Sequence, residues 1–421
     1  MNKRLKIFAV MFQLAVFVSG ATTLDECLTA AEQNYPLVKQ YGLIGQTADL
    51  TVENIGKGWL PQITASAKAS IQNRVVTLPD ALTSMMVADY KGLRKDQYSV
   101  GVDITQTVYD GGAIESGKEA ARRQAEAETA QNDVDLYAVR QRVNELYFGV
   151  LLVDEKIRLS DDYVALLQSN EKKLESMSRR GTASESDYLG VKAERIGVEQ
   201  QRGELVSQRR QLLRLLSAFC GKEIAEVTMP AEPALTGENF RPELRLIDSR
   251  MRLLEANERQ LDAAVRPRLS VFASGYYGYP SLDAYRDMFS HNWTLNGIVG
   301  AKLTWNISAF YTRKNDKAKL NLQRMSLENS RDVFLFNNNM EQIGQDENVA
   351  RYDEMLKTDK EIVALRGSVR KAAESKLAHG IIDVNDLLRN INSENAAKVQ
   401  LSTHQIERLK QLWNKRITTN N

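Results

Sequence analysis

The chain has 421 residues, of which 26% are charged, and its 56 Lys and Arg residues nearly balance its 54 Asp and Glu residues. A formal net charge of +2 gives no general basic field, which argues against a nucleic-acid partner. The length allows two or three domains, and the abundance of Ala, Leu, Glu, Gln and Arg, with only 8 prolines, favours long helices.

The N-terminus has the pattern of an export signal. Lys3, Arg4 and Lys6 accompany a mostly apolar run from Leu5 to Val18, and small residues follow it. This run of about 14 residues is shorter than the ~20 that a membrane-spanning helix needs. We therefore expect a cleaved signal peptide over residues 1–21 rather than a membrane anchor.

A first structural repeat is expected over residues 22–220. It begins with a helix from Leu24 to Gly56, for which Thr23-Leu24-Asp25-Glu26 predicts a capping box. Strands at about 60–73 and 97–109 follow, and then a helical hairpin at about 113–217. Between strand and hairpin, Gly111 and Gly112 mark the strand–helix transition, where glycine permits a sharp redirection.

The hairpin helices are unusually long. From Ala113 to Met177 only isolated glycines interrupt the helical pattern, and at 1.5 Å per residue such a helix is roughly 100 Å long. Apolar residues repeat every seven positions on both arms, which is typical of coiled-coil packing. These positions are Leu136, Val143, Val150, Ile157 and Val164 on the first arm, and Val191, Val198, Leu205, Leu212 and Phe219 on the second.

The second half of the chain repeats the first. The segments "RGTASESDYL" and "HGIIDVNDLL" place Gly181 and Asp187, and Gly380 and Asp386, at the same spacing and 199 residues apart, and "VGVDIT" and "VGAKLT" have the same offset. Residues 221–240 are expected to form a linker or equatorial segment, and residues 241–417 a second repeat, followed by a tail over 418–421. Its expected elements are a helix from Pro242 to Val265, strands at about 267–279 and 293–307, and a helical hairpin at about 309–415.

The four strands point to a membrane. Apolar and polar residues alternate over Gln62–Gln72 and Trp293–Ile307, and aromatic residues lie near the strand ends. Strands of about 11–15 residues exceed the ~5–6 common in soluble sheets and match outer-membrane strands. The alternative is a soluble antiparallel sheet with one wet face. A membrane sheet must close, and about eight strands is the smallest usual barrel, so several copies of the chain would share one barrel.

These segments together resemble the TolC-type outer membrane factors, which are outer membrane efflux proteins. The resemblance rests on "TLDECLTAAEQNYPLVKQ", "GWLPQITASA", "VGVDITQTVYDGGAIESGKEAARRQAEAE" and "RRGTASESDYLGVKAE". It implies a mainly helical fold with β-strands and a homotrimer. Four membrane strands per chain would form a shared twelve-stranded barrel in the outer membrane, and the coiled-coil helices a periplasmic tunnel. It also implies contact with outer membrane lipid, a periplasmic adaptor (membrane fusion) protein and an inner-membrane transporter of RND or ABC type.

The resemblance assigns the hairpin turns to the periplasmic aperture. It places Gly181, Asp187, Gly380 and Asp386 there, and Asp386 matches a position that constricts the pore in the family. An alternative role for the two aspartates is capping of the returning helices, since Asp is favoured at helix N-termini.

The chain departs from the family pattern beside Asp386. The next family carboxylate falls on Arg389, and the family's basic gate position falls on Ile382. The bonding of the gate must therefore differ, and a pair between Asp383 and Arg389 across the turn is our hypothesis.

Catalytic chemistry is not indicated by the sequence. His291, His379 and His404 share no metal-ligand spacing, and phosphate-binding loops and nucleophile elbows are missing. We expect no enzyme activity, cofactor or metal. Cys27 and Cys220 are compatible with a disulfide in an oxidising compartment, but two buried thiols are the favoured interpretation because the sequence does not show that they are close.

The predicted function is the passive outer-membrane exit duct of a tripartite efflux pump for small molecules. An exit duct for type I protein secretion is the alternative within the same family. A periplasmic coiled-coil scaffold without a pore is the alternative from another class.

Overall fold

The computed structural model describes residues 21–85, 89–235 and 237–420. The expected signal peptide therefore lies outside the described residues, apart from Ala21. The elements of the first half are α1 (Leu24–Asn34), α2 (Val38–Gly56), the 3-10 turn η1 (Lys57–Trp59), β1 (Gln62–Ile71), α3 (Asp80–Thr83), β2 (Asp96–Tyr109), α4 (Ala113–Arg179) and α5 (Glu185–Cys220).

The second half has the same order of main elements. They are α6 (Pro242–Ala264), β3 (Arg268–Tyr279), α7 (Ala284–Asp287), β4 (Thr294–Thr304), α8 (Ala309–Ala378) and α9 (Val384–Thr419). The last helix thus includes the first two residues of the expected tail. Among the described residues, no helix combines the length and hydropathy needed to cross a membrane.

The helix expected from Leu24 to Gly56 is interrupted. It begins with the predicted capping box, in which the Thr23 hydroxyl accepts from the Glu26 N–H and the Glu26 carboxylate accepts from the Thr23 N–H. It stops at Tyr35, whose backbone is extended (ψ 136°), because the residue before a proline is disfavoured in the helical conformation. Pro36 therefore divides the segment into α1 and α2.

Two compact units make up the chain. One contains residues up to 38, 133–241 and 335–421, and the other contains residues 39–132 and 242–334. Each unit takes segments from both halves of the sequence. We call the first the hairpin unit, since it contains the turns of both helical hairpins, α4–α5 and α8–α9. We call the second the sheet unit.

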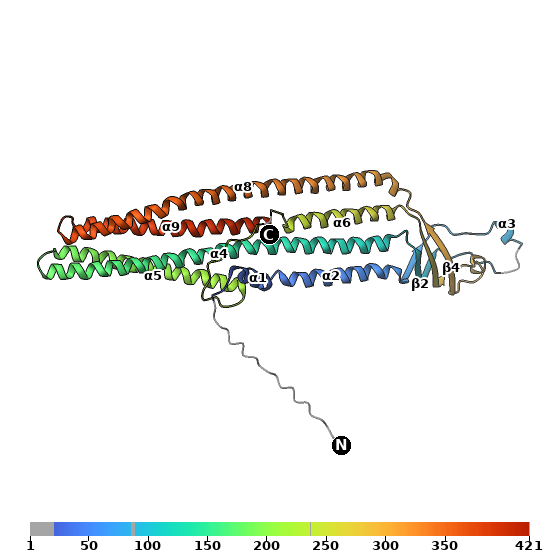
Figure 1. Cartoon of the computed structure of the whole chain (residues 1–421). Helices are drawn as coiled ribbons and strands as arrows, with labels where there is room; N and C mark the ends of the chain where they lie inside the picture. The colour runs from blue at the N-terminus through green and yellow to red at the C-terminus, as the bar shows by residue number, and fades with distance from the viewer. Residues whose placement is uncertain (1–20, 86–88, 236, 421) are drawn as a thin grey trace, which may run out of the picture. The chain divides into compact units, whose positions relative to one another are not determined.

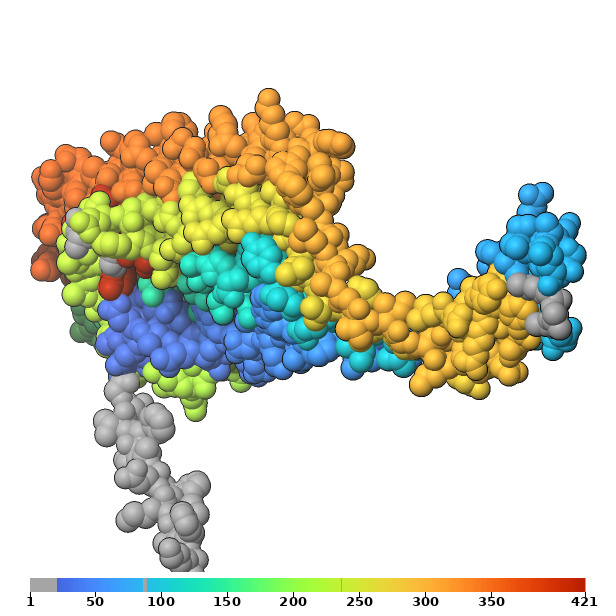
Figure 2. Space-filling view, turned by 90° about the vertical axis from the view of Figure 1, so that its right-hand side faces the viewer, coloured from blue at the N-terminus to red at the C-terminus, as the bar shows by residue number. Residues whose placement is uncertain are grey.

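The sheet unit contains one antiparallel sheet with the order β1-β2-β3-β4. The strand register pairs apolar residues with apolar residues: Ile63 pairs with Ile104, Ala65 with Val102, and Ala273 with Val299. Because side chains alternate between the two faces of a strand, this register places most apolar residues of the four strands on the same face. The surface of the strands that Figure 2 displays has no helix lying over it.

The hairpin unit is held by two apolar clusters. The first surrounds Tyr147 and Phe148 of α4 and includes Leu24, Leu216 and Trp413. The second lies where the two hairpins approach their turns and is described with the site below. Figure 1 shows both turns, α4–α5 and α8–α9, at the same end of this unit. Of the predicted heptad positions, Val143, Val150, Val191 and Val198 are buried, as coiled-coil packing requires.

Candidate functional site

The sheet has an apolar face that is open to its surroundings. Ile71, Leu295 and Val299 are 82–84% exposed, although they belong to the regular alternation of β1 and β4. The opposite face is polar, and the Ser274 hydroxyl donates to the Asp103 carboxylate there at 2.6 Å. Contiguous exposed apolar surface of this kind marks an interaction site, and its alternation with a polar face is typical of outer-membrane strands.

Aromatic side chains gather at one end of this face. The Trp293 ring stacks on Tyr98 with centroids 6.4 Å apart, and it lies 5.5 Å from the Tyr277 ring. At the other end Trp305 packs edge-on against Phe310 at 6.4 Å. Aromatic residues flank the apolar band of membrane strands in this way, because their rings are apolar and their N–H or O–H groups are polar.

Gly111 and Gly112 lie between the end of β2 and the start of α4. Both have positive φ, 72° and 88°, a region that residues with a Cβ rarely adopt. A Cβ on Gly111 would also lie 2.8 Å from the Cβ of Arg266. Glycine is therefore required at position 111 for two reasons, the positive φ and the close approach of Arg266.

Asp110 anchors this transition, and sequence reasoning missed it. Its buried carboxylate accepts from the N–H of Gly112 at 2.8 Å and of Ile114 at 2.6 Å, so it satisfies donors at the start of α4 that have no partner within the helix. The guanidinium of Arg266 donates to the Gly111 carbonyl at 3.3 Å. An Asp followed by two glycines is a turn signal from which this role could have been inferred.

The two hairpin turns have the same geometry. Gly181 and Gly380 have φ of 76° and 68°. Gly181 N–H donates to Ser178 and Thr182 N–H to Met177, and the equivalent bonds close the second turn, with lengths between 2.9 and 3.0 Å. This is a Schellman motif with glycine in the left-handed position. Both helices that precede the turns thus end by the same local mechanism.

The returning helices begin with equivalent residues, Ser184 and Asp383. The Ser184 hydroxyl accepts from the Ser186 N–H, while the Asp187 carboxylate accepts from the Ser184 N–H at 3.2 Å. Asp383 accepts from the Asp386 N–H at 2.8 Å. Capping is therefore performed by Ser184 and Asp383, with Asp187 completing a capping box.

Arg389 pairs with Asp386 rather than with Asp383. Its guanidinium lies 3.7 Å from the Asp386 carboxylate, one helical turn away on an exposed face of α9. The expected Asp383–Arg389 pair is replaced because the Asp383 carboxylate is turned toward the helix N-terminus. Of the predicted aperture residues, the structure brings Asp383, Asp386 and Arg389 together at one turn, and Gly181 and Asp187 form the other.

An apolar cluster holds the two hairpins together beside their turns. Leu167, Leu174 and Val191 of the first hairpin pack with Leu387 and Ile391 of the second. The cluster also contains Tyr163, Val198, Ala373 and Val384, and Ile382 packs against it. The resemblance seen in the sequence aligns Ile382 with a basic gate position, and in the structure this side chain makes a packing contact.

Ion pairs join the two arms of each hairpin at equivalent places. Arg209 pairs with Asp154, and Arg408 pairs with Asp353 at the equivalent place of the second hairpin. The offset of 199 residues that relates the two turns also relates these pairs. Equivalent Asp–Arg pairs therefore fix the register of α5 on α4 and of α9 on α8.

One ion pair of the second hairpin, between Arg370 and Glu394, is largely buried. Glu394 contacts Arg370 and, at 2.9 Å, Lys398. Burial alone would raise the pKa of Glu394, but its contacts with Lys398 and Arg370 outweigh burial and hold the pKa below its ordinary value. Burial would likewise lower the pKa of Arg370, yet the carboxylates of Glu394 and Glu374 raise it. Both groups are therefore charged at neutral pH.

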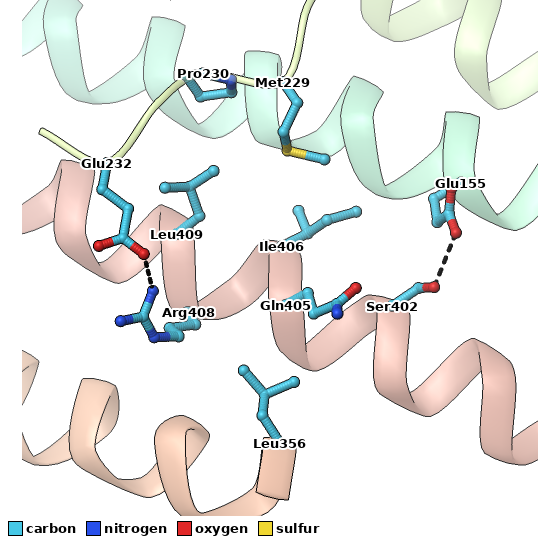
Figure 3. A pocket seen from close by; sticks show the side chains of 10 residues that line it. All are labelled: Glu155, Met229, Pro230, Glu232, Leu356, Ser402, Gln405, Ile406, Arg408 and Leu409. Atoms are coloured by element: carbon cyan, nitrogen blue, oxygen red, sulfur yellow. Dashed lines mark hydrogen bonds and ion pairs between the residues drawn. The ribbon is translucent and has the colours of Figure 1, made fainter. Parts of the chain in front are cut away.

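A pocket of about 380 Å³ lies between the linker, α4, α8 and α9 (Figure 3). Four of its polar side chains are bonded in two pairs. Ser402 donates to Glu155 at 2.8 Å, and Arg408 pairs with Glu232. The remaining wall includes Met229, Ile406 and Leu409. Among the described residues, no group of three or more His, Cys, Asp or Glu side chains is placed to hold a metal.

The family model that matches this chain and the solved structures named below both describe outer-membrane proteins. Residues 28–221 match the family model of the outer membrane efflux proteins. No curated protein matches the chain in sequence.

Solved structures with the same fold cover 94% of this chain. The outer-membrane channel OprN is 15% identical over 89% of its own length, with a TM-score of 0.66. The outer membrane protein VceC of Vibrio cholerae is 13% identical over 96% of its length, with a TM-score of 0.67. The MtrE outer membrane channel of Neisseria gonorrhoeae is 15% identical over 89% of its length, with a TM-score of 0.64. The chain thus matches the outer membrane efflux protein family in sequence over residues 28–221, and it shares its fold with solved outer membrane channels over nearly its whole length.

Proposed function

We propose that three copies of the chain form a passive channel, which serves as the outer-membrane exit duct of a tripartite efflux pump for small molecules. The observation that carries the proposal is the exposed apolar face of the four-stranded sheet. The sequence match to the outer membrane efflux protein family and the shared fold support a location in the outer membrane, with the helical part in the periplasm. The apolar face would contact lipid, and the polar face would line a water-filled lumen.

The need for several copies follows from the sheet edges. β1 and β4 lie at the two ends of the strand order, so each pairs with only one neighbour within the chain. In lipid an unpaired strand edge leaves backbone groups without hydrogen-bond partners, at a cost of several kcal/mol for each group. Pairing β4 of one copy with β1 of the next removes this cost, and three copies supply twelve strands.

The hairpin turns support a gated periplasmic end. Gly181, Asp187, Gly380 and Asp386 would surround the aperture, with Asp383 and Arg389 beside Asp386. For opening, the hairpins would part against the apolar cluster around Leu387. A periplasmic adaptor would dock on the turns, and an inner-membrane transporter of RND or ABC type would supply the energy.

A pair of matched variants tests the channel. Val299→Arg puts a charge on the face proposed to meet lipid, where Arg near the bilayer midplane costs about 2–4 kcal/mol. Ser66→Arg puts the same charge on the polar face. We expect Val299→Arg to prevent trimer assembly and membrane insertion, and Ser66→Arg to insert and conduct in planar bilayers.

The readouts are the mass of the detergent-solubilised protein and the single-channel conductance. A trimer that conducts supports the proposal, and restored resistance to toxic compounds in a strain without its own exit duct supports the pump role. A wild-type protein that remains monomeric in mild detergent, or a Val299→Arg variant that inserts as well as Ser66→Arg, would contradict it.

A further inference from the structure

The N-terminal helix α1 is fastened to the far end of α5. The Asn34 amide donates to the carbonyls of Ala218 and Phe219, at 3.2 and 3.1 Å. These carbonyls belong to the last turn of α5, where they have no partner within the helix. The Tyr35 ring also stacks on Phe219, with centroids 6.3 Å apart and planes within 9° of parallel. The C-terminal end of α1 is therefore held to the end of α5 by contacts that do not involve sulfur.

Cys27 and Cys220 meet inside this contact. They are the only two cysteines of the sequence, and both side chains are buried, with 0% and 5% exposed. The Cys220 thiol donates to the carbonyl oxygen of Cys27, with 3.4 Å between sulfur and oxygen. The neighbouring thiol raises the pKa of Cys27 and lowers that of Cys220. The structure shows the reduced form of the pair.

We propose that Cys27 and Cys220 are joined by a disulfide in the mature protein. The proposal rests on the periplasmic location of the helices, an oxidising compartment in which such bonds form and persist. It does not rest on channel activity.

The oxidant would be a periplasmic thiol oxidase that carries a reactive disulfide. A Cys220 thiolate attacks that disulfide and forms a mixed disulfide, with release of one oxidase thiol. Cys27 then loses its proton and attacks the Cys220 sulfur, which displaces the second oxidase thiol. One sulfur–sulfur bond is formed in the chain, one is broken in the oxidase, and the two protons and two electrons of the chain's thiols pass to the oxidase. Because both side chains are buried once α1 packs on α5, the exchange takes place before that contact closes.

The bond would close a very long loop. Its ends are 193 residues apart, and they enclose both strands of the first half and its entire hairpin. In the chain-entropy account, a cross-link stabilises by restricting the unfolded chain, and more so for longer loops. The bond would thus secure the first helix of the mature protein at the point where α5 ends and the linker begins.

The test is thiol counting on full-length protein extracted from envelopes. Free thiols are trapped with acid, and the protein is unfolded and labelled with a maleimide–polyethylene glycol, with and without prior reduction. We expect no gel shift without reduction and a shift of two labels after it. The cross-linked peptides that contain Cys27 and Cys220 should be found by mass spectrometry only in the unreduced sample.

Single variants provide the controls. Cys27→Ser and Cys220→Ser should each accept one label without reduction, which proves that the reagent reaches either site in the unfolded chain. Wild-type protein that accepts two labels without reduction overturns the proposal, whether or not the protein conducts ions. A linked pair in a protein that does not conduct would support the disulfide and count against the channel, so the two proposals fail separately.

Discussion

Glu171 of α4 and Arg195 of α5 lie 2.6 Å apart across the first hairpin, and the second hairpin carries the same pair with its charges exchanged. There, Arg370 of α8 faces Glu394 of α9, at the positions that the offset of 199 residues relates to Glu171 and Arg195. If α4 packed on α9 in the same register, Glu171 would face Glu394. The exchange therefore favours the pairing of each helix with its own partner, since like charges at a contact are repulsive.

The first prediction concerns this exchange. Glu171→Arg should lower the thermal midpoint of the hairpin unit, because it places a second guanidinium beside Arg195. Adding Arg195→Glu should restore most of the loss, since the pair is then rebuilt with the polarity of the second hairpin. Calorimetry of the purified protein measures both changes.

The control for charge alone is Glu204→Arg, at an exposed position of α5. It changes the net charge as Glu171→Arg does but lies away from Arg195 in the helix. Equal effects of Glu171→Arg and Glu204→Arg, or no recovery in the double variant, would show that the pair has no specific role.

The second prediction concerns the candidate aperture. Asp386→Ala should raise the single-channel conductance or weaken block by divalent cations in planar bilayers, since it removes a carboxylate and leaves Arg389 in place. Asp386→Glu keeps the charge and should behave like the wild type. Unchanged conductance and unchanged block in Asp386→Ala would remove Asp386 from the gate.

The third prediction separates capping from gating. Asp383→Ala should destabilise the start of α9 by about 1 kcal/mol, the usual cost of losing an N-cap side chain. Asp383→Asn should have little effect, because Asn caps as well as Asp. Amide exchange of Val384 and Asp386 measures the local opening. If Asn and Ala are equally harmful at position 383, the charge rather than the cap is what matters.

The fourth prediction is a pH dependence at Glu394. Its pKa is lowered in the folded chain, so its stabilising effect is fully present above the unfolded value of about 4.3. It is lost as the pH falls through the lower folded value, because the unfolded chain then binds the proton more readily. Thermal midpoints between pH 3 and 6 should fall less steeply in Glu394→Gln than in the wild type, although Glu394→Gln is less stable at neutral pH. Parallel curves would rule out this contribution.

The fifth prediction concerns the apolar cluster between the hairpins. Leu387→Ala should cost about 2–5 kcal/mol, as expected for a fully buried leucine, whereas Leu189→Ala, at an exposed position of α5, should cost little. If the cluster holds the channel closed, Leu387→Ala should also raise the fraction of time that the channel is open. A large loss of stability without any change in gating would confine the cluster to a structural role.

The strands and long helices could be predicted from the sequence because each has a simple period. With a period of two residues, Ile63 and Ala65 lie on one face of β1. The strand register then joins that face to Val102 and Ile104 of β2. The break at Pro36 was also within reach of sequence reasoning, since proline disfavours a helical residue before it. The period alone does not detect it, because α1 and α2 are both amphipathic helices.

The details of the candidate site could be predicted less well, because they depend on side-chain direction at the ends of elements. Asp383 and Asp386 are three residues apart, and only the backbone of the turn decides which of them caps the helix and which faces Arg389. The contact of Cys27 with Cys220 arises from tertiary packing and has no local signal. Ile382 could be recognised as a departure from the family, but its place in an apolar cluster required the structure.

The order of the strands in the sheet is also their order in the chain, and this has a consequence for any ring built from copies. Successive strands run in opposite directions, so β1 and β4, the first and last of four, point opposite ways. When the last strand of one molecule meets the first of its neighbour, the alternation continues across the junction without a crossover or a parallel pair. The seam between molecules then has the same hydrogen-bond pattern as the interior of each sheet.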